Sequence, residues 1–152
     1  MKAIIEKITR TNRNNGIALA RIVVGIVFMM HGSQKLFGLF GGGGIEGTTG
    51  YMASLGLEPS ELMAFLAGVG EFFGGLLLLL GLFARVGGFL TACVSLVALL
   101  TVHMSNGFFM SNNGFEYILV LLAVSVSVVI NGAGAYSIDG KLYVKNGNNC
   151  CK

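Results

Sequence analysis

Four apolar stretches dominate this chain, at residues 17–39, 62–83, 86–104 and 116–136, and each is about as long as a helix that crosses a bilayer. The chain has 152 residues, of which 54% are hydrophobic and only 11% are charged, and its mean hydropathy is +0.78. This composition is too apolar for a soluble domain of this size. The sequence therefore predicts an all-α, polytopic membrane protein built as a four-helix bundle.

The basic residues predict how such a bundle is oriented. Apart from Lys35, every Lys and Arg lies before residue 22, at Arg85, or after residue 140. The positive-inside rule then places both termini in the cytoplasm. The first stretch follows a basic segment and has no small-residue cleavage site after it, so we expect it to be a retained helix. We expect residues 1–152 to form a single membrane domain.

The connections between the stretches differ in length and composition. The outer loop at residues 40–58 is rich in glycine, and no Gly-Lys-Ser/Thr follows its glycines, so a flexible linker is predicted rather than a phosphate-binding loop. A short helical pattern at residues 51–56 suits a surface-lying or re-entrant segment. The turn at residues 83–85 is so short that the second and third stretches must form an antiparallel hairpin.

Glycine spacing predicts which helices approach closely. Gly70 and Gly74 form a small-xxx-small pair, and Gly75 extends the same surface. Gly25 and Gly32 are seven residues apart and share a face of the first stretch. We therefore expect close helix packing around residue 71.

Ionisable residues inside the apolar stretches mark the candidate site. Glu71 lies in the middle of the second stretch, where a carboxylate costs on the order of 3 kcal/mol unless it is paired or protonated. On the first stretch, Arg21, His31 and Lys35 fall within a helical sector of about 80°. We expect this polar face to point into the bundle and to supply a partner for Glu71, with His31 nearest in depth. Two alternatives stay open: a purely structural hydrogen bond for Glu71, and snorkelling of Arg21 to the cytoplasmic interface.

A polar pocket is predicted on the outer side of the bundle. His103 ends the third stretch and Glu116 begins the fourth, on the side where Lys35 also lies. Together they suggest a pocket that opens outward and reaches down to Glu71, with the loop asparagines at its mouth. The alternative is that His103 and Glu116 are solvated helix ends in the headgroup region.

Cofactors that the residues could ligate are restricted by spacing. His31 and His103 differ in depth by about 10 Å at 1.5 Å per residue, whereas the axial ligands of one haem lie at similar depth, so haem is disfavoured. No HxxxH or ExxH spacing gathers ligands on one helix, and no metal is expected. Cys93, Cys150 and Cys151 form no CxxC and are expected to be reduced. The net charge of +3 reflects membrane orientation and does not indicate nucleic-acid binding.

Several short motifs occur in order between residues 18 and 139. They are Arg21 with Gly25, His31-Gly32 followed by Lys35-Leu36, Leu55-Gly56-Leu57 with Pro59, Glu71-Phe72-Phe73-Gly74-Gly75 with Gly81, Arg85, and residues 132–139. In this combination the chain resembles the DoxX family of small four-helix bacterial membrane proteins.

The resemblance implies a link to respiratory or thiol redox chemistry in the bacterial plasma (inner) membrane. Some members of the family look like subunits of thiosulfate:quinone or quinol oxidising complexes, and others are associated with oxidative-stress enzymes. It carries over Arg21, His31, Lys35 and Glu71 as candidate site residues. Because a self-sufficient thiol oxidoreductase would need a CxxC, we expect at most a non-autonomous oxidoreductase subunit.

Three functions remain open at this point. The first is a membrane subunit of a quinone- or thiol-linked redox complex, in which His31, Lys35 and Glu71 bind a quinone headgroup or relay a proton to it. The second is a non-enzymatic accessory or scaffold protein whose small-residue faces dock other membrane subunits. The third is a small-solute transporter, which four helices could form only as an oligomer. The expected partners are the lipid bilayer and either other membrane subunits or a second copy of the chain.

Overall fold

The computed structural model describes residues 2–11 and 13–145, and all regular secondary structure in this part of the chain is helical. The α-helices are α1 (Lys2–Thr9), α2 (Asn15–Phe37), α3 (Gly44–Ser54), α4 (Ser60–Leu80), α5 (Ala84–Ala98), α6 (Glu116–Asn131) and α7 (Ile138–Lys145). A π-turn at Leu99–His103 extends α5, and single 3₁₀ turns lie at Leu39–Gly41, Met104–Asn106 and Met110–Asn112. The prediction of an all-α chain is confirmed.

Within residues 2–11 and 13–145, three helical segments are long and apolar enough to cross a membrane: α2, α4, and α5 with its extension to Asn106. The helix α6 is also apolar but has only 16 residues. The prediction that the fourth stretch continues to residue 136 is wrong. The helix ends at Asn131 because Gly132 and Gly134 adopt φ angles of 84° and 74°, which turn the chain back across α2.

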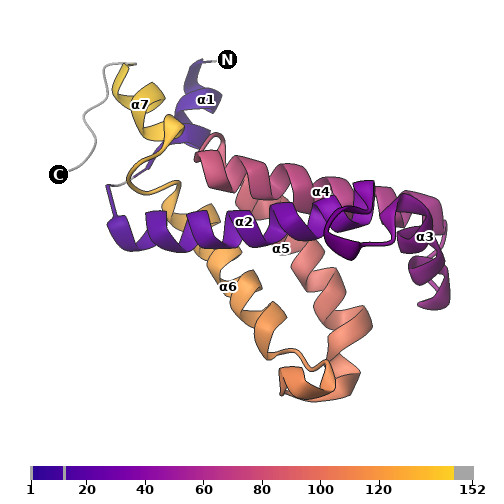
Figure 1. Cartoon of the computed structure of the whole chain (residues 1–152). Helices are drawn as coiled ribbons and strands as arrows, with labels where there is room; N and C mark the ends of the chain where they lie inside the picture. Colours follow the sequence, from indigo (N-terminus) through magenta and orange to yellow (C-terminus); the bar gives the residue numbers. More distant parts are fainter. Residues whose placement is uncertain (1, 12, 146–152) are drawn as a thin grey trace.

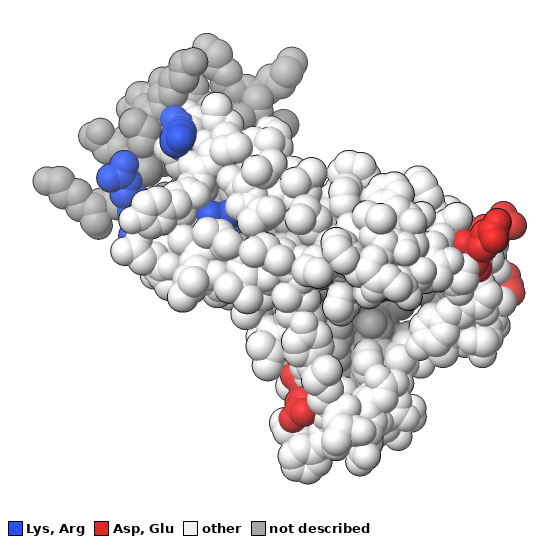
Figure 2. Space-filling view, in the orientation of Figure 1, with Lys and Arg blue, Asp and Glu red and all other residues white. Residues whose placement is uncertain are grey.

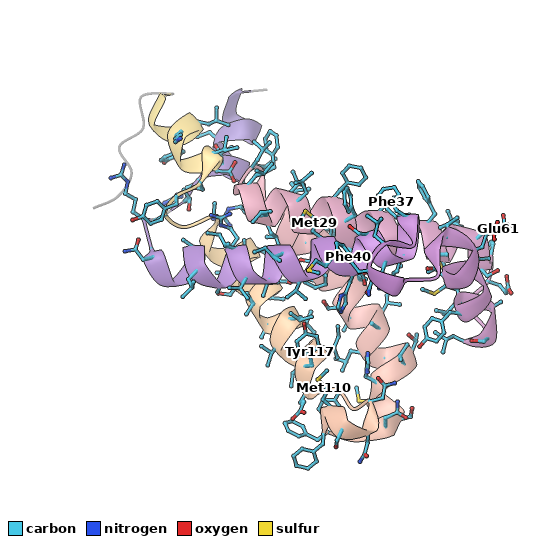
Figure 3. All side chains as sticks on the ribbon, viewed as in Figure 1. Met29, Phe37, Phe40, Glu61, Met110 and Tyr117 are labelled. Atoms are coloured by element: carbon cyan, nitrogen blue, oxygen red, sulfur yellow. The ribbon has the colours of Figure 1, made fainter. Side chains whose placement is uncertain are left out.

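The long helices pack as two pairs that meet at one end of the molecule. Figure 1 shows α2 lying against α4, while α5 and α6 form a second pair that leaves the first near the chain termini and diverges from it. Side chains at the far ends are accordingly well separated: Phe37 and Phe40 lie at the end of α2, and Met110 and Tyr117 lie at the end of the other pair (Figure 3). A wedge-shaped space between the two pairs is visible in the space-filling view of Figure 2.

Glycines allow α2 and α4 to touch backbone to backbone. A Cβ atom on Gly75 would lie 2.5 Å from the Met29 nitrogen and 2.7 Å from the Gly25 oxygen, so a larger residue would push the helices apart. The predicted close packing of the first two stretches around residue 71 is confirmed. Between α5 and α6, the Thr91 hydroxyl donates to the Ser125 hydroxyl at 3.0 Å where both side chains are buried.

The outer loop at residues 40–58 is not the flexible linker that its glycines suggested. It contains α3, whose Met52 and Thr48 are buried against α2 and α4. The Thr48 hydroxyl donates to the Lys35 carbonyl oxygen at 3.1 Å. Gly42 is needed for close approach, because a Cβ there would lie 2.6 Å from the Gln34 Cα. The helical pattern predicted at residues 51–56 is the last turn of α3 and the residues that end it.

Candidate functional site

An ion pair joins the two central helices. Glu71 lies on the face of α4 that packs against α2, and its Oε2 atom accepts a hydrogen bond from the Lys35 Nζ atom at 2.5 Å. The Glu71 side chain is 9% exposed and that of Lys35 is 27% exposed. The carboxylate thus has a partner from the first stretch, but this partner is Lys35 rather than His31.

The ion pair lies on the wall of a pocket of about 490 Å³ in the space between the diverging helix pairs. This volume is within the range of small-molecule sites. Helix α3 covers part of the pocket, and α4 and α5 form its sides; a hollow between the two arms is visible in Figure 2. The walls are mainly apolar, with contributions from Tyr51, Met52, Leu55, Leu57, Met63, Leu66, Ala67, Leu90, Val94, Val97 and Ala98. A ligand here would meet hydrocarbon on most sides and one pair of charges.

His103 and Asn113 line the same pocket away from the ion pair. His103 is the last residue of the π-helical turn that extends α5, and such turns are frequent at functional sites. Its Nδ1 atom lies 2.8 Å from the Asn113 carbonyl oxygen. If Nδ1 carries the proton and donates to this carbonyl, Nε2 is left as an acceptor.

Three of the predicted site residues, His31, Glu116 and Arg21, do not line the pocket. His31 lies one turn before Lys35 on α2, within electrostatic range of both Lys35 and Glu71, but its side chain is exposed on the surface of the helix pair. Glu116 accepts a hydrogen bond from the Met110 backbone nitrogen at 2.7 Å and so stabilises the loop before α6. Of the candidates, the structure brings Glu71, Lys35 and His103 to one cavity.

Arg21 lies at the other end of α2, where the two helix pairs meet, and its residue is fully buried. Its guanidinium donates to the carbonyl oxygens of Ala133 at 2.7 Å, Leu79 at 3.0 Å and Tyr136 at 3.2 Å, and also to that of Leu78. It therefore does not snorkel to the interface. Arg21 holds the end of α4 and the 132–137 turn onto α2, and it takes no part in the pocket.

No sequence pattern indicates the role of Asp139. Its carboxylate oxygens accept hydrogen bonds from the backbone nitrogens of Phe83 and Ala84, both at 2.8 Å, and so cap the start of α5. Burial raises the pKa of this carboxyl, and the two backbone hydrogen bonds and the charges of Arg21 and Arg85 oppose that rise. Asp139 lies seven residues after Gly132, which ends α6, and its contact with the start of α5 arises only in the tertiary fold.

The cysteines and the side chains that could bind a metal form no additional site in the described residues. Cys93 is a free thiol that lines the pocket, although it is not predicted from the sequence as a site residue. Cys150 and Cys151 lie outside the described residues. Within residues 2–11 and 13–145, no three His, Cys, Asp or Glu side chains gather closely enough to hold a metal ion.

Comparison with known proteins decides the family. The model of the family described as DoxX matches residues 16–104, which is more than half of the chain. The chain belongs to the DoxX family. The match includes Arg21, His31, Lys35, Glu71 and His103, and thus the whole ion pair.

Relatives of similar length support this assignment to the DoxX family. "Putative oxidoreductase CatD" of Bacillus subtilis is 35% identical over 135 residues, covering 88% of this chain and 92% of the relative. "Inner membrane protein YqjF" of Escherichia coli is 31% identical over 130 residues, covering 86% and 94%. No solved structure gives a significant match. With its three apolar helices, this DoxX protein is a multi-pass protein of the inner membrane.

Proposed function

We propose that this DoxX protein is the membrane subunit of a redox complex and that its pocket holds a quinone headgroup beside Lys35 and Glu71. The observation that carries the proposal is the ion pair on the wall of an otherwise apolar pocket of about 490 Å³. A charged pair inside a membrane protein is costly to retain, and such residues mark ligand or proton pathways. The name of the Bacillus subtilis relative agrees with the redox class.

The residues present fit a quinone. The Lys35 ammonium has three N–H groups and gives one to Glu71, which leaves donors for a carbonyl oxygen. The apolar side chains of α3, α4 and α5 suit a ring and the start of an isoprenoid chain. The wedge between the helix pairs would let such a chain extend into the lipid.

A bound quinone would supply two-electron chemistry that is coupled to protons. The residues of this chain would bind and orient it and handle the proton. The positive charge of Lys35 next to Glu71 stabilises the carboxylate in a mostly apolar wall. If the Lys35 ammonium moves to the quinone, Glu71 can hold a proton at Oε2 instead. His103 and Asn113 lie on the same cavity and offer acceptors and donors toward the outer mouth. Proton relay between Glu71 and that mouth is the role we assign to them.

The proposal includes a membrane orientation for all four long helices. We place both termini in the cytoplasm, with the wedge opening outward. In support, Figure 2 shows Lys and Arg at the terminal end and Asp and Glu at the far ends of the helix pairs. Helix α6 would span about 24 Å at 1.5 Å per residue, less than the hydrocarbon thickness of about 30 Å, so tilt of the others and local thinning would be required. A reporter that is active only in the cytoplasm should therefore be active when it is fused after residue 145, and a reporter that needs the outer side of the membrane should be inactive there.

The test is quinone retention by the purified protein. The chain would be solubilised gently, extracted with organic solvent and analysed for quinone by chromatography. Glu71→Gln and Lys35→Met should each lower the retained quinone about tenfold, since each removes a charge-assisted contact. Glu61→Gln is the matched control for the acid, because Glu61 is exposed in the first turn of the same helix (Figure 3). Lys141→Met is the control for the cation.

A second measurement separates binding from folding. Infrared difference spectra with and without added quinone should show a carboxyl band that shifts in the parent protein and in Glu61→Gln but is absent in Glu71→Gln. Identical spectra with and without quinone, or equal retention by pocket and control variants, would refute the quinone site. Co-purification of a defined membrane subunit together with full function of Glu71→Gln would favour the scaffold function, and solute flux in proteoliposomes would favour a transporter.

A further inference from the structure

A second, polar pocket of about 260 Å³ lies where the two helix pairs meet, and it is lined by Arg10, Thr11, Arg85, Ile130 and Asn131. It is at the opposite end of α5 from the apolar pocket. We propose that this pocket binds a phosphate group, and that its natural source is the headgroup of an anionic phospholipid.

The guanidinium of Arg85 is fixed in place but not fully used. Its Nη1 atom donates to the carbonyl oxygens of Val129 and Ile130 at the end of α6, the latter at 2.9 Å. Its Nε and Nη2 atoms donate to the Arg10 carbonyl oxygen at 3.4 and 3.2 Å. Arginine has five N–H groups, so these contacts leave one on Nη2 for a ligand. A held guanidinium loses little entropy when it binds an anion.

Arg10 adds a second cation to the same place. Its side chain is exposed and lies within electrostatic range of Arg85. No hydrogen bond from its guanidinium to another described residue is present, and the ion pair of the described chain is the distant one between Lys35 and Glu71. Asp139 is the acid near Arg85, and both of its carboxylate oxygens are engaged by the start of α5. Among the described residues, the charges that act on Arg85 are those of Arg10 and Asp139, and Arg21 also acts on Asp139, so at this end of the molecule three arginines accompany one acid.

The position of the pocket points to a lipid. Arg85 lies in the first turn of α5, and Asn131 is the last residue of α6, so the pocket sits where two apolar helices reach the membrane surface. Phosphates of the bilayer lie at this depth, and basic pockets between membrane helices bind anionic headgroups. The exposed side chains of Ile130 and Val86 next to it would meet the acyl chains.

The experiment measures lipid binding to the full chain in detergent by native mass spectrometry. The probes are short-chain phosphatidylglycerol, phosphatidylcholine of equal chain length, and inorganic phosphate as a competitor. Arg10→Gln removes the cation without breaking a side-chain hydrogen bond to the described residues, and Arg13→Gln is the matched control, because Arg13 is exposed in the same segment but does not line the pocket. Arg85→Lys keeps the charge but loses the fork of donors.

We expect phosphatidylglycerol to bind the parent protein and Arg13→Gln equally, and to bind Arg10→Gln about fivefold more weakly, the change expected for one basic residue at a membrane surface. Phosphatidylcholine should bind more weakly than phosphatidylglycerol. Competition by inorganic phosphate at the concentration of the lipid would assign the site to free phosphate instead of a headgroup. Equal binding of both lipids, or equal losses in Arg10→Gln and Arg13→Gln, would overturn the proposal.

Discussion

The ion pair between Lys35 and Glu71 gives a quantitative prediction about stability. In the substitution Lys35→Met, the Glu71 carboxylate keeps its place on α4 with 9% of its side chain exposed but loses the ammonium at 2.5 Å. A lone charge deep in a membrane protein costs on the order of 3 kcal/mol, and breaking a buried pair costs roughly 3–5 kcal/mol. Because the carboxylate can take up a proton, we expect the lower figure, a loss of about 3 kcal/mol in the free energy of unfolding.

Removal of both charges should cost much less than removal of one. In Lys35→Met with Glu71→Met, two apolar side chains of similar length occupy the same space, and such replacements of buried ion pairs are often neutral. We expect the double variant to lie within about 1 kcal/mol of the parent protein, and thus to be about 2 kcal/mol more stable than Lys35→Met alone.

The assay is reversible unfolding in mixed detergent micelles, followed by circular dichroism at fixed protein and lipid concentrations. Lys141→Met is the control, since Lys141 is exposed on α7, and it should change the free energy of unfolding by less than about 0.5 kcal/mol. If Lys35→Met were as stable as this control, or if the two single losses simply added, Glu71 would not depend on Lys35 and the reasoning would be refuted.

Three further predictions concern the packing at the end where the helix pairs meet and along α2. Arg21→Lys should lower the free energy of unfolding by about 3 kcal/mol, because an ammonium cannot reach the carbonyls that the buried guanidinium satisfies; an unchanged unfolding curve would contradict this. Gly75→Ala should destabilise by more than about 2 kcal/mol, whereas Gly50→Ala, with nothing near its Cβ position, should be neutral or stabilising by up to about 1 kcal/mol in the same assay. Because burial raises the pKa of Asp139, the folded protein binds a proton there more readily than the unfolded chain, so the free energy of unfolding should fall as pH rises from the usual carboxyl range to the raised pKa, and Asp139→Asn should lose that slope.

Part of this candidate site can be predicted from the sequence. A carboxylate in an apolar stretch requires a partner, so Glu71 and the polar face with Lys35 could be found from residue types and helical periodicity alone. His103 could be placed on the same side by its position at the end of a span. Choosing Lys35 over His31 as the partner required the stagger of α2 against α4, and this stagger depends on where glycines let the backbones touch.

Other features could not be predicted because they arise from contacts between distant segments. The glycines of residues 40–58 look like a linker in isolation, yet α3 packs there because Met52 and Thr48 find buried positions against α2 and α4. Arg21 looks like a snorkelling or site residue until the 132–137 turn brings carbonyl groups to it.

The sequence by itself determined the class of the protein, the number of apolar stretches and the presence of a buried acid that needs a cationic partner. These follow from the sequence because the free-energy cost of placing polar groups in hydrocarbon depends on the residues of each segment alone. Only the tertiary structure decided that the helices form two pairs that diverge, that Lys35 forms the ion pair with Glu71, and that an apolar pocket opens beside this ion pair. Those outcomes depend on how glycine surfaces and buried hydrogen bonds fit together between helices, which no single stretch encodes.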